Sequence, residues 1–136
     1  MPEARNIGRR GLLVGASVAA LPARAADFPE KPIALVVPFA AGGAIDVMAR
    51  LIGEQASRAL GQPVLVDNRG GAAGLIGAAA VARSEPDGYT LLLASAAQVT
   101  IPPWINRSLT FDPPKDLAPI AHIADTPMVL VVSPKS

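Results

Sequence analysis

The sequence predicts an α/β fold, in which a parallel sheet carries helices on both faces. Residues 33–39, 64–67 and 90–94 are apolar runs of strand length, typical of strands buried in a parallel sheet. Two stretches of helical composition separate these runs, and the connections between them are short. Strands that alternate with helices in this way are joined by right-handed crossovers, which place the strands parallel.

The first helix is predicted over residues 44–60. Its apolar residues recur at spacings of three and four, which is the pattern of one helix face. Four charged residues follow one another at four-residue intervals and predict an alternating-sign ladder on the opposite face: Asp46, Arg50, Glu54 and Arg58. Gly61 is expected to end the helix, and Pro63 prevents its continuation.

The rest of the chain contains one more helix and two further strand candidates. The alanine-rich residues 72–83 predict a closely packed helix between the second and third strands. Pro86, Asp87 and Gly88 have the chemistry of a turn, because proline fixes one backbone dihedral and glycine permits a positive one. In the proline-rich stretch that follows the third strand, Trp104 is expected to be a packing anchor, with the lining of a cleft as the alternative. The last two strand candidates are residues 120–123 and 128–132.

Residues 1–25 have the three-part pattern of an export signal. Three arginines give a positive start, residues 11–21 form an uncharged apolar run, and Ala23-Arg24-Ala25 has the small residues that signal peptidase accepts. The apolar run is too short to span a bilayer, which takes about 20 residues. We expect cleavage after Ala25 and export to the periplasm. The pair Arg9-Arg10 leaves both the Sec and the twin-arginine route open.

The composition of residues 26–136 argues against several classes of partner and cofactor. This stretch has 8 basic and 10 acidic residues, so its formal charge is −2 and nucleic acid is not an expected partner. The chain has no cysteine and one histidine, His122, so neither a thiolate site nor a multi-histidine metal site is expected. No apolar run after residue 25 is long enough for insertion into a membrane. No metal or cofactor is expected.

The first candidate site is a glycine turn where a strand runs into a helix. Ligands of open α/β sheets bind beyond the carboxyl ends of the strands. Backbone N–H groups at a helix start lack a partner within the helix and suit a carboxylate or phosphate oxygen. The candidate ligand-binding residues here are Phe39, Ala40, Ala41, Gly42, Gly43 and Asp46. A tight turn, with Asp46 favouring the first turn of the helix, explains the same spacing equally well.

The second candidate site follows the third strand, at Ser95, Ala96 and Gln98. The side chains of Ser95 and Gln98 could offer donors and acceptors to the same crevice. The alternative is that Ser95 is an ordinary turn residue.

A third glycine cluster, Gly71–Gly77, follows a strand and opens a helix, as a dinucleotide-binding fingerprint does. Its spacing is GxxGxxG rather than GxGxxG, and leucines stand where an acidic ribose ligand belongs. We interpret these glycines as turn and helix-packing residues, with a dinucleotide-binding oxidoreductase domain as the alternative. The sequence contains no nucleophile elbow and no defensible catalytic triad, so the chain is not expected to be an enzyme.

Four sequence features, taken in order, resemble one receptor family. They are the P-F-x-x-G-G-x-x-D turn at residues 38–46, LGQPVLVDNRGGAAG at 60–74, PDGYTLLL at 86–93 and FDPPKDLAPI at 111–120. This order is similar to that of the substrate-binding receptors of tripartite tricarboxylate transporters, the Bug-type receptors. The resemblance implies a two-lobed periplasmic binding protein that grips a small carboxylate with the first glycine turn and the loop after the third strand. Its partners would be the membrane components of the transporter.

The resemblance also implies that the chain is incomplete. Members of the family are more than twice as long, so residues 26–136 are expected to be the N-terminal portion of the first lobe. The second lobe and a returning C-terminal segment would be absent, leaving a sheet edge and an apolar face uncovered. We expect such a fragment to be marginally stable and to bind ligand poorly. The ligand stays unnamed, and Asp46 could either repel its carboxylate or bind an ammonium group on it.

Overall fold

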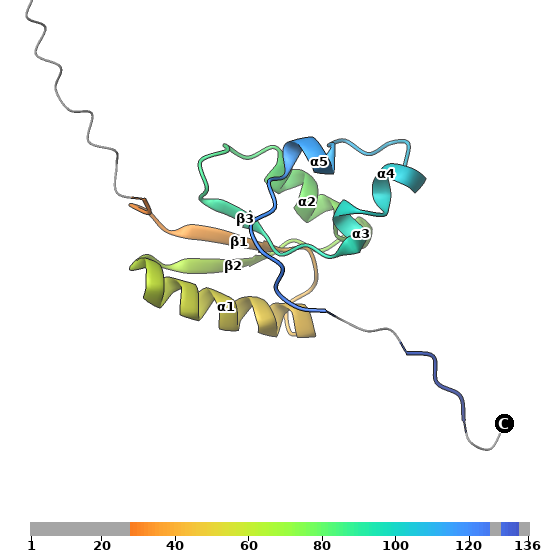
Figure 1. The fold of residues 1–136 in the computed structure, drawn as a ribbon, viewed down its shortest axis with the longest axis horizontal. Coiled ribbons are helices and arrows are strands. Elements are labelled where there is room, and N and C mark those ends of the chain that lie inside the picture. The colour runs from red at the N-terminus through yellow and green to blue at the C-terminus, as the bar shows by residue number, and fades with distance from the viewer. Residues whose placement is uncertain (1–27, 126–128, 134–136) are drawn as a thin grey trace, which may run out of the picture.

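A three-stranded parallel sheet forms the centre of the fold (Figure 1). The computed structural model describes residues 28–125 and 129–133, so the expected export signal, residues 1–25, lies outside the described part. The strands are β1 (Ile33–Val37), β2 (Val64–Asn68) and β3 (Thr90–Leu92). Their order in the sheet is β2-β1-β3, with β1 hydrogen-bonded to a strand on each side.

Helices cover both faces of this sheet, which confirms the predicted fold class. α1 (Ala44–Leu60) lies against β1 and β2, whereas α2 (Leu75–Ala82) lies on the other face against β1 and β3 (Figure 1). Leu35 and Val37 of β1 form a buried cluster with Ala49 of α1. β1 is therefore enclosed on both faces and both edges, as its uninterrupted apolar sequence requires.

α1 begins and ends at the predicted residues. Gly43 precedes it with an extended backbone, at φ −81° and ψ 170°. Gly61 follows it in the left-handed conformation, at φ 68°, and donates its N–H to the Ser57 carbonyl oxygen at 3.0 Å. Glycine adopts this conformation without the steric conflict that a Cβ would cause, so Gly61 terminates the helix.

α1 approaches the sheet through small side chains rather than through its larger apolar ones. Its buried residues are Asp46, Ala49 and Gly53. A Cβ built at Gly53 would lie 3.5 Å from the Val64 carbonyl oxygen, so the helix runs close to β2. Leu51, a member of the predicted apolar face, is 61% exposed. The spacing of apolar residues thus predicted the helix but not the face that packs against the sheet. That face consists of small residues because the helix lies close to the strand.

Short helical segments connect and follow the main elements. They are η1 (Ala72–Gly74), α3 (Ala96–Val99), α4 (Pro102–Ile105) and α5 (Pro113–Asp116). The predicted second helix starts only at Leu75, because Ala72, Ala73 and Gly74 have positive φ angles that a right-handed helix excludes. None of the described helices combines the length and apolar character that a membrane span requires.

Three expectations for the later part of the sequence are wrong within the described residues. Residues 120–123 and 129–132 form no strand, and residue 128 lies outside the described part. Leu130 is 96% exposed. An apolar run becomes a strand only where a neighbouring strand pairs with its backbone, and these residues have no such neighbour within the described part. Trp104, expected to be a packing anchor, is 88% exposed on α4.

Two glycines inside helices predict opposite responses to alanine. At Gly77 of α2, an added Cβ would lie 2.8 Å from the Arg69 carbonyl oxygen, and overpacking of this kind costs about 1–3 kcal/mol. At Gly53 of α1 the nearest atom is 3.5 Å away, and alanine gains about 0.5–1 kcal/mol over glycine in a helix. In urea denaturation, Gly77→Ala should lower the free energy of unfolding and Gly53→Ala should raise it. Shifts of the same sign would contradict this account of the packing.

Candidate ligand-binding site

Three loops meet at the edge of the sheet where the parallel strands end. Loop 1 (residues 38–44, including the first residue of α1) follows β1, and loop 2 (69–74) follows β2. Loop 3 (93–98, including the start of α3) follows β3. The connection from β1 to β2 runs one way across the sheet, and the connection from β2 to β3 returns past β1. The chain therefore changes direction between β1 and β3. Open α/β sheets bind ligands at such a switch point, beyond the carboxyl ends of the strands.

Loop 1 presents its backbone to the solvent. Its predicted site residues, all exposed except the partly buried Phe39, are Phe39, Ala40, Ala41, Gly42 and Gly43. Within the described residues, the N–H groups of Gly43 and Ala44 have no hydrogen-bond partner. They stand at the start of a 17-residue helix, whose dipole adds partial positive charge there. Loop 1 thus offers N–H donors and no side-chain oxygen.

Asp46 points into the protein and braces loop 1. Its side chain is 4% exposed, and its carboxylate accepts a hydrogen bond from the Gly42 N–H at 2.8 Å. Asn68 Nδ2 and Arg50 Nε donate to the same carboxylate, each at 3.0 Å. Arg50, then Gly42, then Asn68 together lower the pKa of Asp46 to about 2. The prediction of an exposed Asp46 in the charge ladder of α1 is wrong, because these donors draw the carboxylate inward.

Asn68 links the end of β2 to loop 1, and it was not among the predicted site residues. Its Nδ2 also donates to the Phe39 carbonyl oxygen at 3.2 Å, and its Oδ1 accepts from Arg50 at 3.4 Å. In the sequence, the only indication of this role was that Asn68 ends a strand next to a glycine turn, which is weak evidence for a site residue. Phe39 and Asp46 stand 29 and 22 residues before it, so no local pattern could name them as its partners.

Ser95 and Gln98 are brought together, but their polar groups bind each other. The backbone N–H and the hydroxyl of Ser95 donate to Gln98 Oε1, at 2.9 and 2.8 Å. Gln98 Nε2 donates to the Ala73 carbonyl oxygen of loop 2 at 2.7 Å, and the Gln98 side chain is fully buried. Ala96 is exposed, and no described group accepts a hydrogen bond from its N–H. Loop 3 therefore also turns a backbone donor towards the solvent.

Gly74 and Gly77 are packed against the other two loops, whereas Gly71 is exposed and a Cβ there would collide with Ile76 of α2. A Cβ at Gly74 would collide with the amide of Gln98 and lie 3.0 Å from Pro38 Cβ. A Cβ at Gly77 would lie 3.3 Å from Pro38 Cα. Both glycines are buried, so neither offers its backbone to a pyrophosphate. This arrangement agrees with their interpretation as turn and helix-packing residues.

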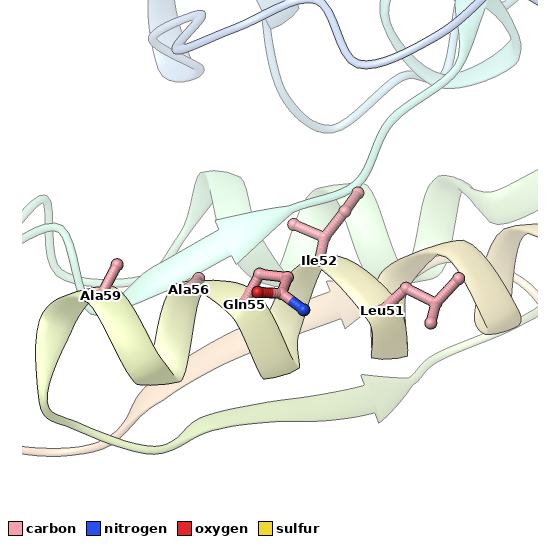
Figure 2. A pocket seen from close by; sticks show the side chains of 5 residues that line it. All are labelled: Leu51, Ile52, Gln55, Ala56 and Ala59. Atoms are coloured by element: carbon pink, nitrogen blue, oxygen red, sulfur yellow. The ribbon is translucent and has the colours of Figure 1, made fainter.

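An apolar depression lies on α1, away from the three loops. It is lined by Leu51, Ile52, Gln55, Ala56 and Ala59, which follow one flank of the helix (Figure 2). A carboxylate is held by charged groups or N–H donors, and Gln55 is the one polar side chain of this lining. The loops, and not this depression, are therefore the candidate site for a carboxylate.

Asp46 should give the chain a specific response to acid. Its folded pKa of about 2 lies below the ordinary value of 3.8, so its stabilising effect is complete above about pH 4 and is lost as the pH falls towards 2. Asp46→Asn replaces an acceptor oxygen by a donor that faces other donors. We expect this variant to unfold at lower urea concentration than the wild type at pH 7, and the difference to shrink between about pH 4 and pH 2.

Glu85→Gln, which removes a carboxylate from an exposed position, is the control for the loss of one charge. A difference between wild type and Asp46→Asn that stays constant from pH 7 to pH 2 would show that folding does not lower the pKa of Asp46, and would contradict this account of its hydrogen bonds.

Comparison with known proteins assigns the chain to a family. The family described as "Tripartite tricarboxylate transporter family receptor" matches residues 48–136. A UPF0065 protein of Bordetella bronchiseptica is 44% identical over 133 residues, which is 98% of this chain and 39% of that protein. The chain therefore spans about two fifths of the length of this curated relative.

Two solved structures are similar to the chain in both sequence and fold. Rpa4515 of R. palustris, solved with adipate, is 38% identical with a TM-score of 0.61, over 65% of this chain and 29% of that one. MatC (Rpa3494) from Rhodopseudomonas palustris, solved with bound malate, is 38% identical with a TM-score of 0.62, over 65% of this chain and 30% of that one. The alternative of an oxidoreductase domain is wrong, because the family that matches the chain is one of transporter receptors. The chain belongs to the tripartite tricarboxylate transporter family of receptors.

Proposed function

We propose that loops 1 and 3 hold a carboxylate group of a small solute in the periplasm, as part of a receptor that serves a tripartite tricarboxylate transporter. The observation that carries this proposal is the group of backbone N–H donors at the switch point, on Gly43, Ala44 and Ala96, which no described group engages. Hydrogen bonds from N–H groups to an ionised carboxylate are about twice as strong as those between neutral groups. A helix start next to them adds favourable potential for an anion.

The acceptor oxygens of the nearby side chains are already hydrogen-bonded, which favours an anionic solute. Asp46 already accepts three hydrogen bonds, and Gln98 Oε1 already accepts two. The hydroxyl proton of Ser95 is directed at Gln98. Few acceptors are therefore left for an ammonium group, whereas the donors remain available. Asp46 therefore need not repel a solute carboxylate or bind an ammonium group. We assign it the role of shaping loop 1.

The relatives support a solute with two carboxylates. Two structures that share this chain's fold at 38% identity are described with adipate and with malate, and both are dicarboxylates. Loops 1 and 3 supply donors for one carboxylate. We propose that the other is held by a second lobe, and that residues 26–136 form the N-terminal portion of the first lobe. Residues 1–25 would be the export signal, by the Sec or the twin-arginine route.

Calorimetric titration with malate and adipate tests the proposal. We would compare residues 26–136 with a chimera in which these residues replace their counterpart in MatC. The chimera should bind a dicarboxylate and should melt at a higher temperature in its presence, since a ligand that binds only the folded state stabilises it. Residues 26–136 alone should bind weakly, and succinamide, an uncharged diamide, should bind neither protein. A chimera that is folded by circular dichroism but binds no carboxylate would refute the proposal.

A substitution at the start of α1 tests the role of the backbone donors. Ala44→Pro removes one N–H at the first helical position, where proline is well tolerated, and the extended Gly43 suits a residue before proline. Ala44→Ser keeps the N–H and is the matched control. In the chimera, Ala44→Pro should weaken dicarboxylate binding by about tenfold or more, because a hydrogen bond to a charged group is lost. Equal affinities of the two variants would remove Ala44 from the site.

A further inference from the structure

We infer that Gln98 is a positioning residue that holds loops 2 and 3 together as one unit and so fixes the direction of the N–H donor that loop 3 offers. This inference rests on the proposed function of the loops. It concerns a side chain that the solvent does not reach, since Gln98 is 0% exposed. A fully buried amide cannot touch a solute, so its effect on binding has to act through other residues.

Each polar atom of the Gln98 amide has a defined partner. Oε1 accepts from the backbone N–H and the hydroxyl of Ser95, which fixes the first residue of the turn into α3. Nε2 donates to the Ala73 carbonyl oxygen at 2.7 Å, across 25 residues of sequence. One side chain thus fastens loop 3 to loop 2. The N–H of Ala96, next to Ser95, takes its direction from this arrangement.

Ordinary helix capping explains only one of the three hydrogen bonds of the Gln98 amide. The bond from the Ser95 N–H to Gln98 Oε1 belongs to a capping box, in which the Ser95 hydroxyl oxygen in turn accepts from a backbone N–H of α3. α3 has four residues, and a helix of that length is not stable without tertiary contacts. The bond from Nε2 to Ala73 contributes nothing to capping. It is a tertiary bond, and it holds the segment whose conformation is least favourable in the described chain.

That segment is the turn at Ala72 and Ala73, with φ angles of 47° and 54°. A residue with a Cβ costs roughly 1–2 kcal/mol in this conformation, which persists only where the surroundings impose it. The Gln98 amide imposes it from one side, and Gly74 makes room, since any Cβ there would collide with the amide. The glycine and the glutamine are therefore interdependent, and loss of the amide should release both loops.

Hydrogen–deuterium exchange of this chain separates the two explanations. Gln98→Glu keeps an acceptor for Ser95 but loses the donor to Ala73. Gln98→Met has a side chain of similar size but loses the bonds to both Ser95 and Ala73. We expect Gln98→Glu to raise the exchange rate of residues 71–75, and Gln98→Met to raise it there and in residues 95–98. α1 should exchange as in the wild type. If Gln98→Glu leaves residues 71–75 as protected as in the wild type, Gln98 is only a helix cap and the inference fails.

Binding is measured in the chimera with malate as the probe. Both variants should lower the affinity for malate by about tenfold or more while the protein stays folded by circular dichroism. Each leaves a buried hydrogen-bonding group without its partner, so the loops no longer hold the Ala96 N–H in its position. Gln55→Glu on the exposed flank of α1 makes the same change of charge away from the loops and should bind as the wild type does.

The outcomes of the two measurements are distinguishable. A wild-type chimera that binds no carboxylate refutes the proposed function, while the exchange experiment still decides whether Gln98 ties the loops. A wild type that binds malate, with both Gln98 variants binding it equally well, overturns the positioning role.

Discussion

The hydrogen bonding of β1 to a strand on each side determines where the three loops can lie. Leu35 is aligned with Val66 on one side and with Leu91 on the other, so the three strands end at nearly the same level. Had β3 paired with the outer edge of β2 instead, its loop would lie two strands away from loop 1. The order β2-β1-β3 places β3 next to β1, so loop 3 follows the strand beside the one that loop 1 follows.

Amides and a carboxylate, in addition to the close packing of Gly74 and Gly77 against Pro38, join the loops to one another. Buried polar groups are costly unless they are hydrogen-bonded, and none of the buried side-chain polar atoms among the described residues lacks a partner. Asn68 connects the end of β2 to loop 1, and Gln98 connects loop 3 to loop 2. Directional bonds define a single geometry more strictly than apolar packing does. The loops thus form a continuous frame with backbone groups on its open side.

The sequence predicted the elements of the fold better than their contacts. Apolar runs and glycine ends gave α1 to the residue and the strands to within two residues, because these signals are local. The role of Asp46 could not be predicted, since helical spacing placed it on the exposed face and only the tertiary donors Gly42 and Asn68 turn it inward. Asn68 itself was missed for the same reason. The runs at 120–123 and 128–132 misled because a strand is defined by its neighbour and not by its own composition.

The low pKa of Asp46 bears on how acidity would reach a carboxylate receptor of this kind. Free carboxylic acids titrate around pH 4, about two units above Asp46. As a medium is acidified, the solute therefore becomes neutral while loop 1 still keeps its brace. Under the proposed function, the protonation of the solute, and not that of Asp46, would then set the lower pH limit of carboxylate binding.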